Sequence, residues 1–138
     1  MFECLRIPRS IYDAMIAHAL RQRPAECVGL LAGSTDGTVR ARYELVNASA
    51  SPTRYSADAR SLLQAERQRR QDGLEFLAIY HSHPTSEPWP SQTDLAENYW
   101  GTSVMHLIVS LRLTPPRVAA WWLEERHYRP GRFEIVPG

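Results

Sequence analysis

Hydrophobic and polar residues recur along the chain with two different periods, and the change of period separates expected helices from expected strands. In residues 11–22 the apolar side chains recur every three or four positions, which predicts an amphipathic helix with Ser10 as its N-cap. Residues 58–72 show the same period among many Arg and Gln residues, so they predict a second, surface helix that ends at Gly73. A short third helix is expected over residues 91–100.

Runs of apolar and β-branched residues, separated by turn residues, predict the strands. The Asp36-Gly37 pair between two such runs is a strong hairpin signal, whereas residues 48–57 and the proline-rich segment 84–90 are expected to be loops. The order of these elements predicts a mixed α/β (α+β) fold, in which helices pack on one layer of sheet. The expected strands are 3–7, 26–33, 38–47, 74–81, 103–111, 117–124 and 126–135.

The composition of the 138-residue chain fits one folded domain. No apolar run approaches the roughly 20 residues that cross a bilayer, and 16 basic against 15 acidic residues lack the basic excess typical of nucleic-acid binding. Every basic residue is Arg, which excludes P-loop and Schiff-base chemistry because both need a lysine. The chain start lacks the order of a signal peptide, and Cys4 and Cys27 are too few for a disulfide framework. We therefore expect a cytoplasmic protein with reduced cysteines that binds neither membrane nor nucleic acid.

Residues 81–94 bring together the residue types that bind a metal ion. His81 and His83 stand two positions apart at the end of an apolar strand, so both imidazoles point the same way and can reach one zinc ion. Pro84 turns the chain away from the sheet, and the following loop returns it to Ser91 and Asp94 at a helix start. Asp94 can supply a third ligand, and two histidines with one carboxylate are a common catalytic zinc set.

Hydrolysis at such a centre needs a proton acceptor and a donor for the developing oxyanion. Ser91 is the candidate donor, while Glu26, Glu87 and Glu97 are candidate bases among which spacing does not choose. Each signal alone also has a structural interpretation, since Ser91 and Asp94 match a helix capping box and a His-x-His pair can simply end a strand. Their combination at this spacing is hard to explain by capping.

The order His81-Ser82-His83-Pro84, six residues, then Ser91-Gln92-Thr93-Asp94 resembles the JAMM motif of the MPN+ metalloprotease family. Residues 26–33, Glu-Cys-Val-Gly-Leu-Leu-Ala-Gly, resemble the segment in which that family carries an upstream glutamate. The resemblance runs from the first helix to the strands after residue 103. It implies a cytidine-deaminase-like fold, a curved mixed sheet flanked by helices, in a single domain that covers residues 1–138.

The resemblance also implies a role for each motif residue. His81, His83 and Asp94 match the ligands of one zinc ion per chain, Glu26 matches the general acid/base, and Ser91 matches the residue that stabilises the tetrahedral intermediate. The implied reaction is hydrolysis of a peptide or isopeptide bond after the C-terminal glycine of a ubiquitin-like protein. The short chain resembles compact bacterial members that act on sulfur-carrier proteins, and the leaving group is left open among a C-terminal extension, a conjugated lysine and an added cysteine.

Residues outside the motif carry further expectations. Trp89 is expected to be partly exposed and to line, with the loop 84–90, the channel for a Gly-Gly substrate tail. His106 is expected to be a core histidine with satisfied hydrogen bonds, and His18 is expected at the surface. Trp121 and Trp122 are expected to pack on the sheet, one on each face.

Three other functions compete with the hydrolase. A non-catalytic MPN-type interaction scaffold shares the fold, but such members typically lack motif ligands that this chain carries. A zinc nucleobase deaminase needs His-x-Glu and Pro-Cys-x-x-Cys, which the sequence does not contain. A DNA-repair-associated relative of the family resembles a longer chain with an added DNA-binding region. We therefore expect a zinc hydrolase.

Overall fold

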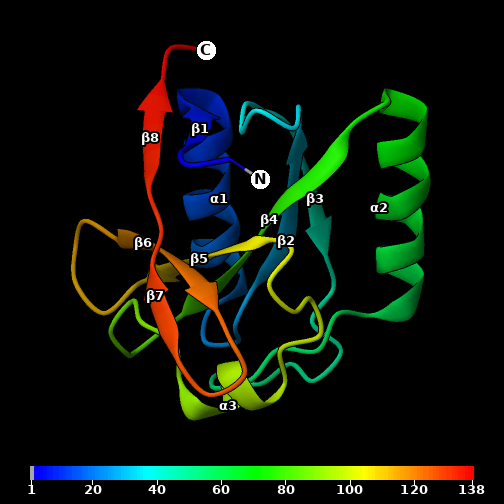
Figure 1. Ribbon diagram of the computed structural model, residues 1–138. Helices are drawn as coiled ribbons and strands as arrows, with labels where there is room; N and C mark the ends of the chain where they lie inside the picture. The colour runs from blue at the N-terminus through cyan, green and yellow to red at the C-terminus, as the bar shows by residue number, and fades with distance from the viewer. Residues whose placement is uncertain (1) are drawn as a thin grey trace.

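The computed structural model describes residues 2–138 and confirms the mixed α/β class (Figure 1). Six strands form the main sheet in the order β3-β2-β4-β5-β6-β7, while β1 and β8 form a separate parallel pair. The structure therefore contains a two-stranded sheet in addition to the single layer of sheet that the sequence predicted. In chain order the elements are β1 (Leu5–Pro8), α1 (Arg9–Gln22), β2 (Val28–Gly33), β3 (Val39–Leu45), α2 (Ala59–Asp72), β4 (Glu75–His83), α3 (Gln92–Ala96), β5 (Met105–Ser110), β6 (Arg117–Leu123), β7 (Tyr128–Pro130) and β8 (Phe133–Val136).

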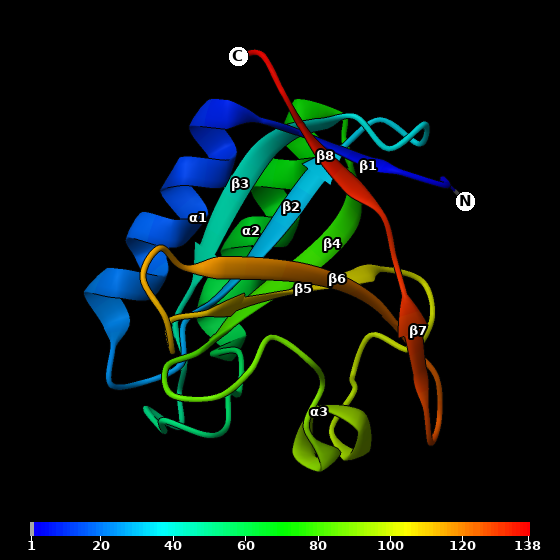
Figure 2. The ribbon, with the colours of Figure 1, turned by 90° about the vertical axis from the view of Figure 1, so that its left-hand side faces the viewer.

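The two long helices lie on opposite faces of the main sheet and bury two apolar clusters (Figures 1 and 2). On one face, Met15 of α1 packs in a cluster that includes Tyr80 of β4. On the other face, Ala65 of α2 packs in a cluster that includes Ile79. Because successive side chains of a strand alternate between faces, the odd-numbered residues at the end of β4 share the face of α2.

The strands β4 and β5 run parallel, in contrast to their neighbours in the main sheet. Parallel neighbours need a crossover connection, and here residues 84–104 supply it, with α3 lying below the strand ends (Figure 2). The candidate motif therefore lies at the end of a central strand and on the crossover that leaves it. Within residues 2–138, no helix combines the length and the apolar character needed to span a bilayer.

The helix ends agree with the sequence for α2 but not for α1. Asp58 caps α2 by accepting a hydrogen bond from the backbone N–H of Ser61 at 3.0 Å. Gly73, the predicted end of the helix, is in the left-handed conformation. The prediction of Ser10 as the N-cap of α1 was wrong. Strand β1 leads directly into α1, so Pro8 occupies the N-cap position without a side-chain cap, and Ser10 lies in the first turn.

The third helix is shorter than expected and stops at Ala96. The side chain of Asn98 accepts a hydrogen bond from the backbone N–H of Trp100 at 3.1 Å and donates one to the carbonyl of Gly101 at 2.9 Å. Such local side-chain bonds compete with helix continuation. The predicted helix over residues 91–100 is therefore a single short helix followed by a turn.

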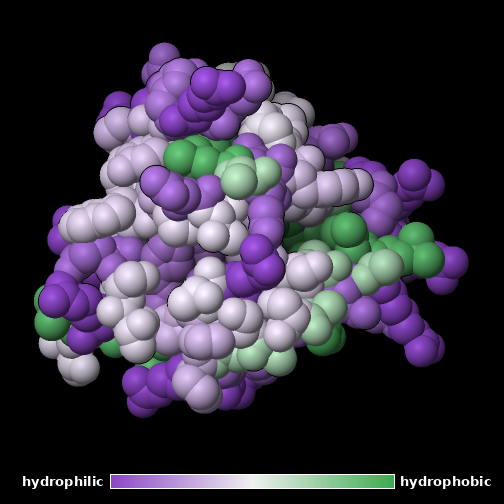
Figure 3. All heavy atoms as spheres, turned by 90° about the horizontal axis from the view of Figure 1, so that it is seen from below, coloured by the Kyte–Doolittle hydropathy of each residue, from purple (hydrophilic) through white to green (hydrophobic). Residues whose placement is uncertain are grey.

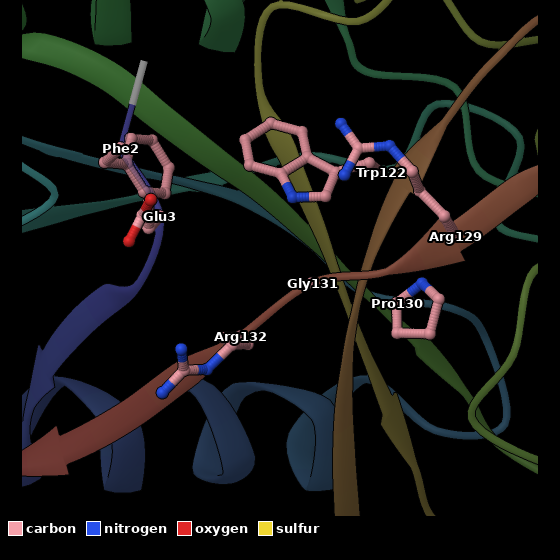
Figure 4. A pocket seen from close by; sticks show the side chains of 7 residues that line it. All are labelled: Phe2, Glu3, Trp122, Arg129, Pro130, Gly131 and Arg132. Carbon is pink, nitrogen blue, oxygen red and sulfur yellow. The ribbon is translucent and has the colours of Figure 1, made fainter.

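The expected last strand, 126–135, is two strands that belong to different sheets. Gly131 and Arg132 separate the two strands, and an added Cβ atom at Gly131 would lie 3.0 Å from the Met105 side chain and 3.4 Å from Trp122 Nε1. Figure 4 shows Gly131 beside Trp122, between β7 and β8. The close approach favours glycine here, and beyond this point β8 pairs with β1 and not with the main sheet.

The surface position expected for His18 was wrong, because its side chain is buried between α1 and the sheet. Its Nδ1 atom lies 2.8 Å from the Tyr80 hydroxyl, which also accepts a hydrogen bond from Arg42 at 3.0 Å. The Tyr80 ring lies across the neighbouring strand at Gly29, where a Cβ atom would come within 2.3 Å of it. Helix α1 therefore places His18 over a buried tyrosine hydroxyl.

We expect acid to destabilise the fold partly through His18. Burial lowers the pKa of His18 from 6.5 to about 4, against the opposing attraction of Glu44. Because the unfolded chain binds this proton more tightly, the stability from neutral His18 is complete above about pH 6.5 and is lost as the pH falls toward about 4. In metal-free protein, His18→Gln should therefore reduce the fall in urea midpoint between about pH 7 and pH 5. The matched change at exposed His127, to Gln, should leave this fall as it is in the wild type, and an unaltered fall in His18→Gln would contradict the assignment.

Candidate metal centre

The side chains of His81, His83 and Asp94 meet, buried, at the end of β4. The Nε2 atoms of the two histidines lie 3.3 Å apart, and Asp94 Oδ2 lies 3.3 Å from His81 Nε2 and 3.0 Å from His83 Nε2. Tetrahedral zinc with ligands at about 2.0–2.1 Å holds neighbouring ligand atoms about 3.3 Å apart. The three donor atoms therefore have the spacing that one metal ion requires, and β4 extends two residues beyond its predicted end to carry both histidines.

His83 is oriented by a second contact. Its Nδ1 atom lies 2.8 Å from the backbone carbonyl oxygen of Glu87, which can only accept a hydrogen bond. The neutral ring therefore carries its proton on Nδ1 and leaves the Nε2 lone pair to bind a metal.

Asp94 and His83 each shift the pKa of the other. Burial raises the pKa of Asp94, but the neighbouring His81 and His83 and the backbone N–H of Ser91 outweigh it and hold that pKa well below 3.8. Burial lowers the pKa of His83, but Asp94 and the Glu87 carbonyl outweigh it and raise that pKa above 6.5. Asp94 is thus an ionised carboxylate, the form that a cation binds.

Ser91 and Asp94 form a capping box at the start of α3. The Ser91 hydroxyl accepts a hydrogen bond from the Asp94 backbone N–H at 3.0 Å, and the Ser91 backbone N–H donates to Asp94 Oδ2 at 2.9 Å. The structural interpretation of this pair is therefore correct, and the same bonds aim the carboxylate at the two histidines. The hydroxyl accepts in this contact, so its proton remains able to serve a second partner.

The pairing of β2 with β4 places Glu26 next to the centre. Strands β2 and β4 are antiparallel with Val28 opposite His81, so the same register continued places Glu26 beside His83. The Glu26 side chain is buried, and its Oε1 atom has no hydrogen-bond partner among residues 2–138. Burial raises the pKa of Glu26 to about 8, against the attraction of His83.

The structure distinguishes the three acids among which sequence spacing alone did not choose. Glu87 pairs with Arg112, and Glu97 pairs with Arg54 at 2.8 Å. Glu26 instead presents a buried, unpartnered oxygen next to the centre. Buried polar atoms are normally hydrogen-bonded, so this oxygen is the one that a bound water or substrate would satisfy.

Tyr55 is a site residue that the sequence analysis missed. Its ring stacks on His81 with ring centroids 4.7 Å apart and an interplanar angle of 27°. It comes from the loop between β3 and α2, where the Asn47 side chain accepts hydrogen bonds from the backbone of Ser49 and Ser56. A lone aromatic in an otherwise polar loop was the available signal.

His106 lies in the core, but the expectation of satisfied hydrogen bonds was wrong. Neither ring nitrogen has a hydrogen-bond partner among residues 2–138. Its neighbours across β4 and β6 are Ile79 and Trp121, and burial lowers the pKa of His106 to about 3. His106 is therefore neutral, and it stands outside the His-His-Asp cluster.

Two grooves flank the centre, and Figure 3, the view from below, shows hydrophobic side chains gathered on the side of α2. Trp89 is 49% exposed, which agrees with the partial exposure expected for it. The groove next to Tyr55 is largely apolar and is lined by Tyr55, Ser56, Ala57, Leu62, Tyr99 and Trp100, among others. The groove on the other side is lined by His83, Ser86, Glu87, Trp89, Ser91 and Arg112, among others.

The fold is that of a JAB/MPN-class domain, and its buried donor set is compatible with a metal ion. The chain belongs to the family of prokaryotic homologs of the JAB domain, whose model matches residues 8–124. The JAMM resemblance drawn from the motif is thereby confirmed at the level of the family.

Relatives with assigned activities cover different shares of the chain. It is 42% identical over 97 residues to the probable TtuB-protein conjugate cleaving protease of Thermus thermophilus, covering 70% of this chain and 64% of that one. It is 37% identical over 92 residues to the CysO-cysteine peptidase of Mycobacterium tuberculosis, covering 66% and 63%. These two matches thus span just under two thirds of each relative. The desampylase of Pyrococcus furiosus is 30% identical over 126 residues, covering 91% and 86%.

Solved structures share the fold. A protein of Desulfitobacterium hafniense superposes with a TM-score of 0.89 at 27% identity and covers 100% of this chain and 94% of its own. A JAB1/MPN domain protein from Archaeoglobus fulgidus superposes with a TM-score of 0.61 at 18% identity, covering 95% and 98%. The predicted mixed sheet flanked by helices is therefore confirmed.

Proposed function

We propose that the chain is a zinc metallopeptidase that hydrolyses the amide bond after the C-terminal glycine of a ubiquitin-like or sulfur-carrier protein. The observation that carries the proposal is the buried triangle of His81, His83 and Asp94 with the unpartnered carboxylate of Glu26 beside it. Two relatives are named for the cleavage of TtuB-protein conjugates and of CysO-cysteine, and these names support a carrier protein as the substrate. We assign the activity to one domain, residues 1–138, in the cytoplasm, which the unpaired state of Cys4 and Cys27 supports.

Zinc, one ion per chain, is the metal we propose, with His81, His83 and Asp94 as ligands. Two imidazoles and a carboxylate suit zinc and leave a coordination position open. When bound, zinc makes water a nucleophile near neutral pH and polarises the scissile carbonyl.

Glu26 is the proposed general acid/base. Its carboxylate takes a proton from the attacking water and returns it to the leaving amine. Burial raises the pKa of Glu26 to about 8. Because this value is close to neutral pH, the carboxyl group can both take up and release a proton there.

Ser91 is the proposed oxyanion donor. The Asp94 backbone N–H holds the Ser91 oxygen in place, so the hydroxyl proton can point to the oxygen of the tetrahedral intermediate. Such pre-positioned donors stabilise charge that develops only in the transition state.

The proposal is tested with purified sulfur-carrier proteins whose C-terminal glycine bears a short extension, a lysine conjugate or a single cysteine. Intact mass after incubation reports which bond is cut. Cleavage that stops with a chelator and returns with zinc would support the proposal. A carrier that binds tightly but stays intact with zinc present would favour the non-catalytic scaffold.

Trp89 is the proposed substrate-binding residue beside the scissile bond. Its half-exposed indole lines the groove that begins at His83 and Ser91, so Trp89→Ala should raise KM for a carrier about tenfold while zinc content stays the same. Leu20→Ala removes a comparably exposed apolar side chain from α1 and should leave KM unchanged. Wild-type KM in Trp89→Ala would remove Trp89 from the substrate site.

A further inference from the structure

Side chains from three strands hold three consecutive backbone carbonyls of the loop 84–90. The Ser110 hydroxyl of β5 donates to the carbonyl of Ser86 at 2.6 Å. His83 of β4 is bound to the carbonyl of Glu87 at 2.8 Å, and the Trp121 indole N–H of β6 donates to the carbonyl of Pro88 at 2.7 Å. A proline-rich loop with little secondary structure of its own is thus tied to the sheet at each of these positions.

Trp121 lies on the sheet face that carries the metal centre. It pairs in register with His106 of β5, and residues in register across neighbouring strands share a face. From the other side, Tyr128 of β7 packs edge-on against the Trp121 ring, with centroids 5.1 Å apart and an interplanar angle of 82°. The indole is therefore held between β7 and the loop.

The three tied carbonyls belong to the segment of chain between His83 and Ser91, two residues of the centre. The tie at Glu87 is also the contact that orients His83. The residue after Pro88 is Trp89, and two positions further on Ser91 caps α3 and aims Asp94. A shift of the loop therefore moves a ligand, the oxyanion donor and the exposed indole together.

We propose that Trp121 and Ser110 are positioning residues, which set the loop 84–90 and through it Ser91, His83 and Trp89. Neither residue has a polar atom within the donor triangle, so they act through the loop. Misplacing a catalytic group by a small distance costs rate, because the reacting groups must be held in near-attack geometry. The consequence for turnover rests on the proposed function, whereas the holding of the loop does not.

The neighbouring tryptophan offers a matched comparison. Trp122 is on the same strand but on the opposite face, where it packs in the apolar cluster with Met105 and Leu107. Figure 4 shows it with Arg129, whose guanidinium lies 5.6 Å from the Trp122 ring centroid, and with Phe2, in a pocket on that face. Trp121→Phe and Trp122→Phe therefore remove the same indole N–H from two faces of one strand, and only the first contacts the loop.

The first experiment measures hydrogen exchange of the amides in residues 85–91 of the zinc-loaded protein by mass spectrometry. We expect exchange in this segment to accelerate about tenfold in Trp121→Phe and in Ser110→Ala, and to stay at the wild-type rate in Trp122→Phe. Equal protection of the segment in Trp121→Phe and Trp122→Phe would overturn the proposal. This result does not depend on any substrate, so it stands apart from the proposed function.

The second experiment compares kcat and KM for a carrier that the wild type cleaves. In Trp121→Phe we expect kcat to fall about tenfold with about one zinc per chain retained, and Trp122→Phe should change Tm but not kcat. A fall in Tm without any change in kcat for Trp121→Phe would show a purely structural role and overturn the proposal. If the wild type cleaves no carrier, the proposed function fails while the exchange result still decides whether the loop is held.

Discussion

Replacing Glu26 by Gln is expected to leave the metal bound and to lower kcat/KM by about a hundredfold to ten-thousandfold. Gln has the same shape as Glu but cannot take up a proton from water or return it to the leaving amine. The three donors His81, His83 and Asp94 remain in place, since none of their contacts involves the Glu26 side chain. Elemental analysis for zinc and single-substrate kinetics on the same preparation would check both halves of the expectation.

The matched control is Glu97, an acid that sequence spacing could not separate from Glu26. Glu97→Gln breaks an exposed ion pair with Arg54. Exposed ion pairs contribute little to stability, so this change should lower kcat/KM by no more than about threefold. If Glu26→Gln turned over at the wild-type rate, another group would be the base.

The Glu26→Gln protein should also be well folded in the absence of metal, and the sign of the pKa shift shows why. Burial raises the pKa of Glu26 from 4.5 to about 8, so the folded chain holds this proton more tightly than the unfolded chain does. The corresponding stability is complete below about pH 4.5 and is lost as the pH rises through about 8. Above about pH 8, metal-free Glu26→Gln should therefore unfold at a Tm no lower than that of the metal-free wild type. Loss of activity in this variant would then reflect chemistry and not folding.

The second large effect is expected from His83→Ala, which should reduce zinc from about one ion per chain to near zero and abolish cleavage. The substitution removes one of three donors and also the contact that ties the Glu87 carbonyl. Two remaining donors bind a metal much less tightly than three. Zinc per chain in the purified protein, measured by elemental analysis before and after zinc is added back, is the readout.

His106→Met is the control for His83→Ala, since it removes another buried histidine from the same face of the sheet. The His106 nitrogens make no hydrogen bond within residues 2–138, so an apolar side chain of similar size should be tolerated. Zinc should stay at about one ion per chain in this variant. Zinc in neither the wild type nor His83→Ala, even after addition, would contradict the metal assignment and favour the interaction scaffold.

Local patterns in the sequence predicted the features that depend on neighbours along the chain. Two histidines two positions apart in a strand must share a face, and they do. Helix α2 ends at Gly73, as the capping preference of glycine predicted. The spacing of Ser91 and Asp94 predicted both a capping box and a carboxylate at a helix start, and the structure contains both in the same pair of bonds.

The errors arose where contacts between distant segments outweigh local preference. Ser10 is not the N-cap of α1, because β1 runs directly into this helix. His18 is buried because the Tyr80 hydroxyl, far along the chain, lies beneath it. The last expected strand divided at Gly131, since pairing with β1 is available to β8 only once the two ends of the chain are brought together.

By itself the sequence determined the class of fold, because strand period and helix capping act over a few residues, and its motif determined the resemblance to the family and the proposed ligands His81, His83 and Asp94. Only the tertiary structure decided that Glu26, and not Glu87 or Glu97, is the buried unpaired acid at the centre, since this follows from the register of β2 against β4. The stacking of Tyr55 on the centre and the tie from Trp121 to the loop were likewise decided by the fold. Such contacts join residues far apart in the chain, and their existence depends on which strands pair and in which register, a choice set by many weak interactions acting together.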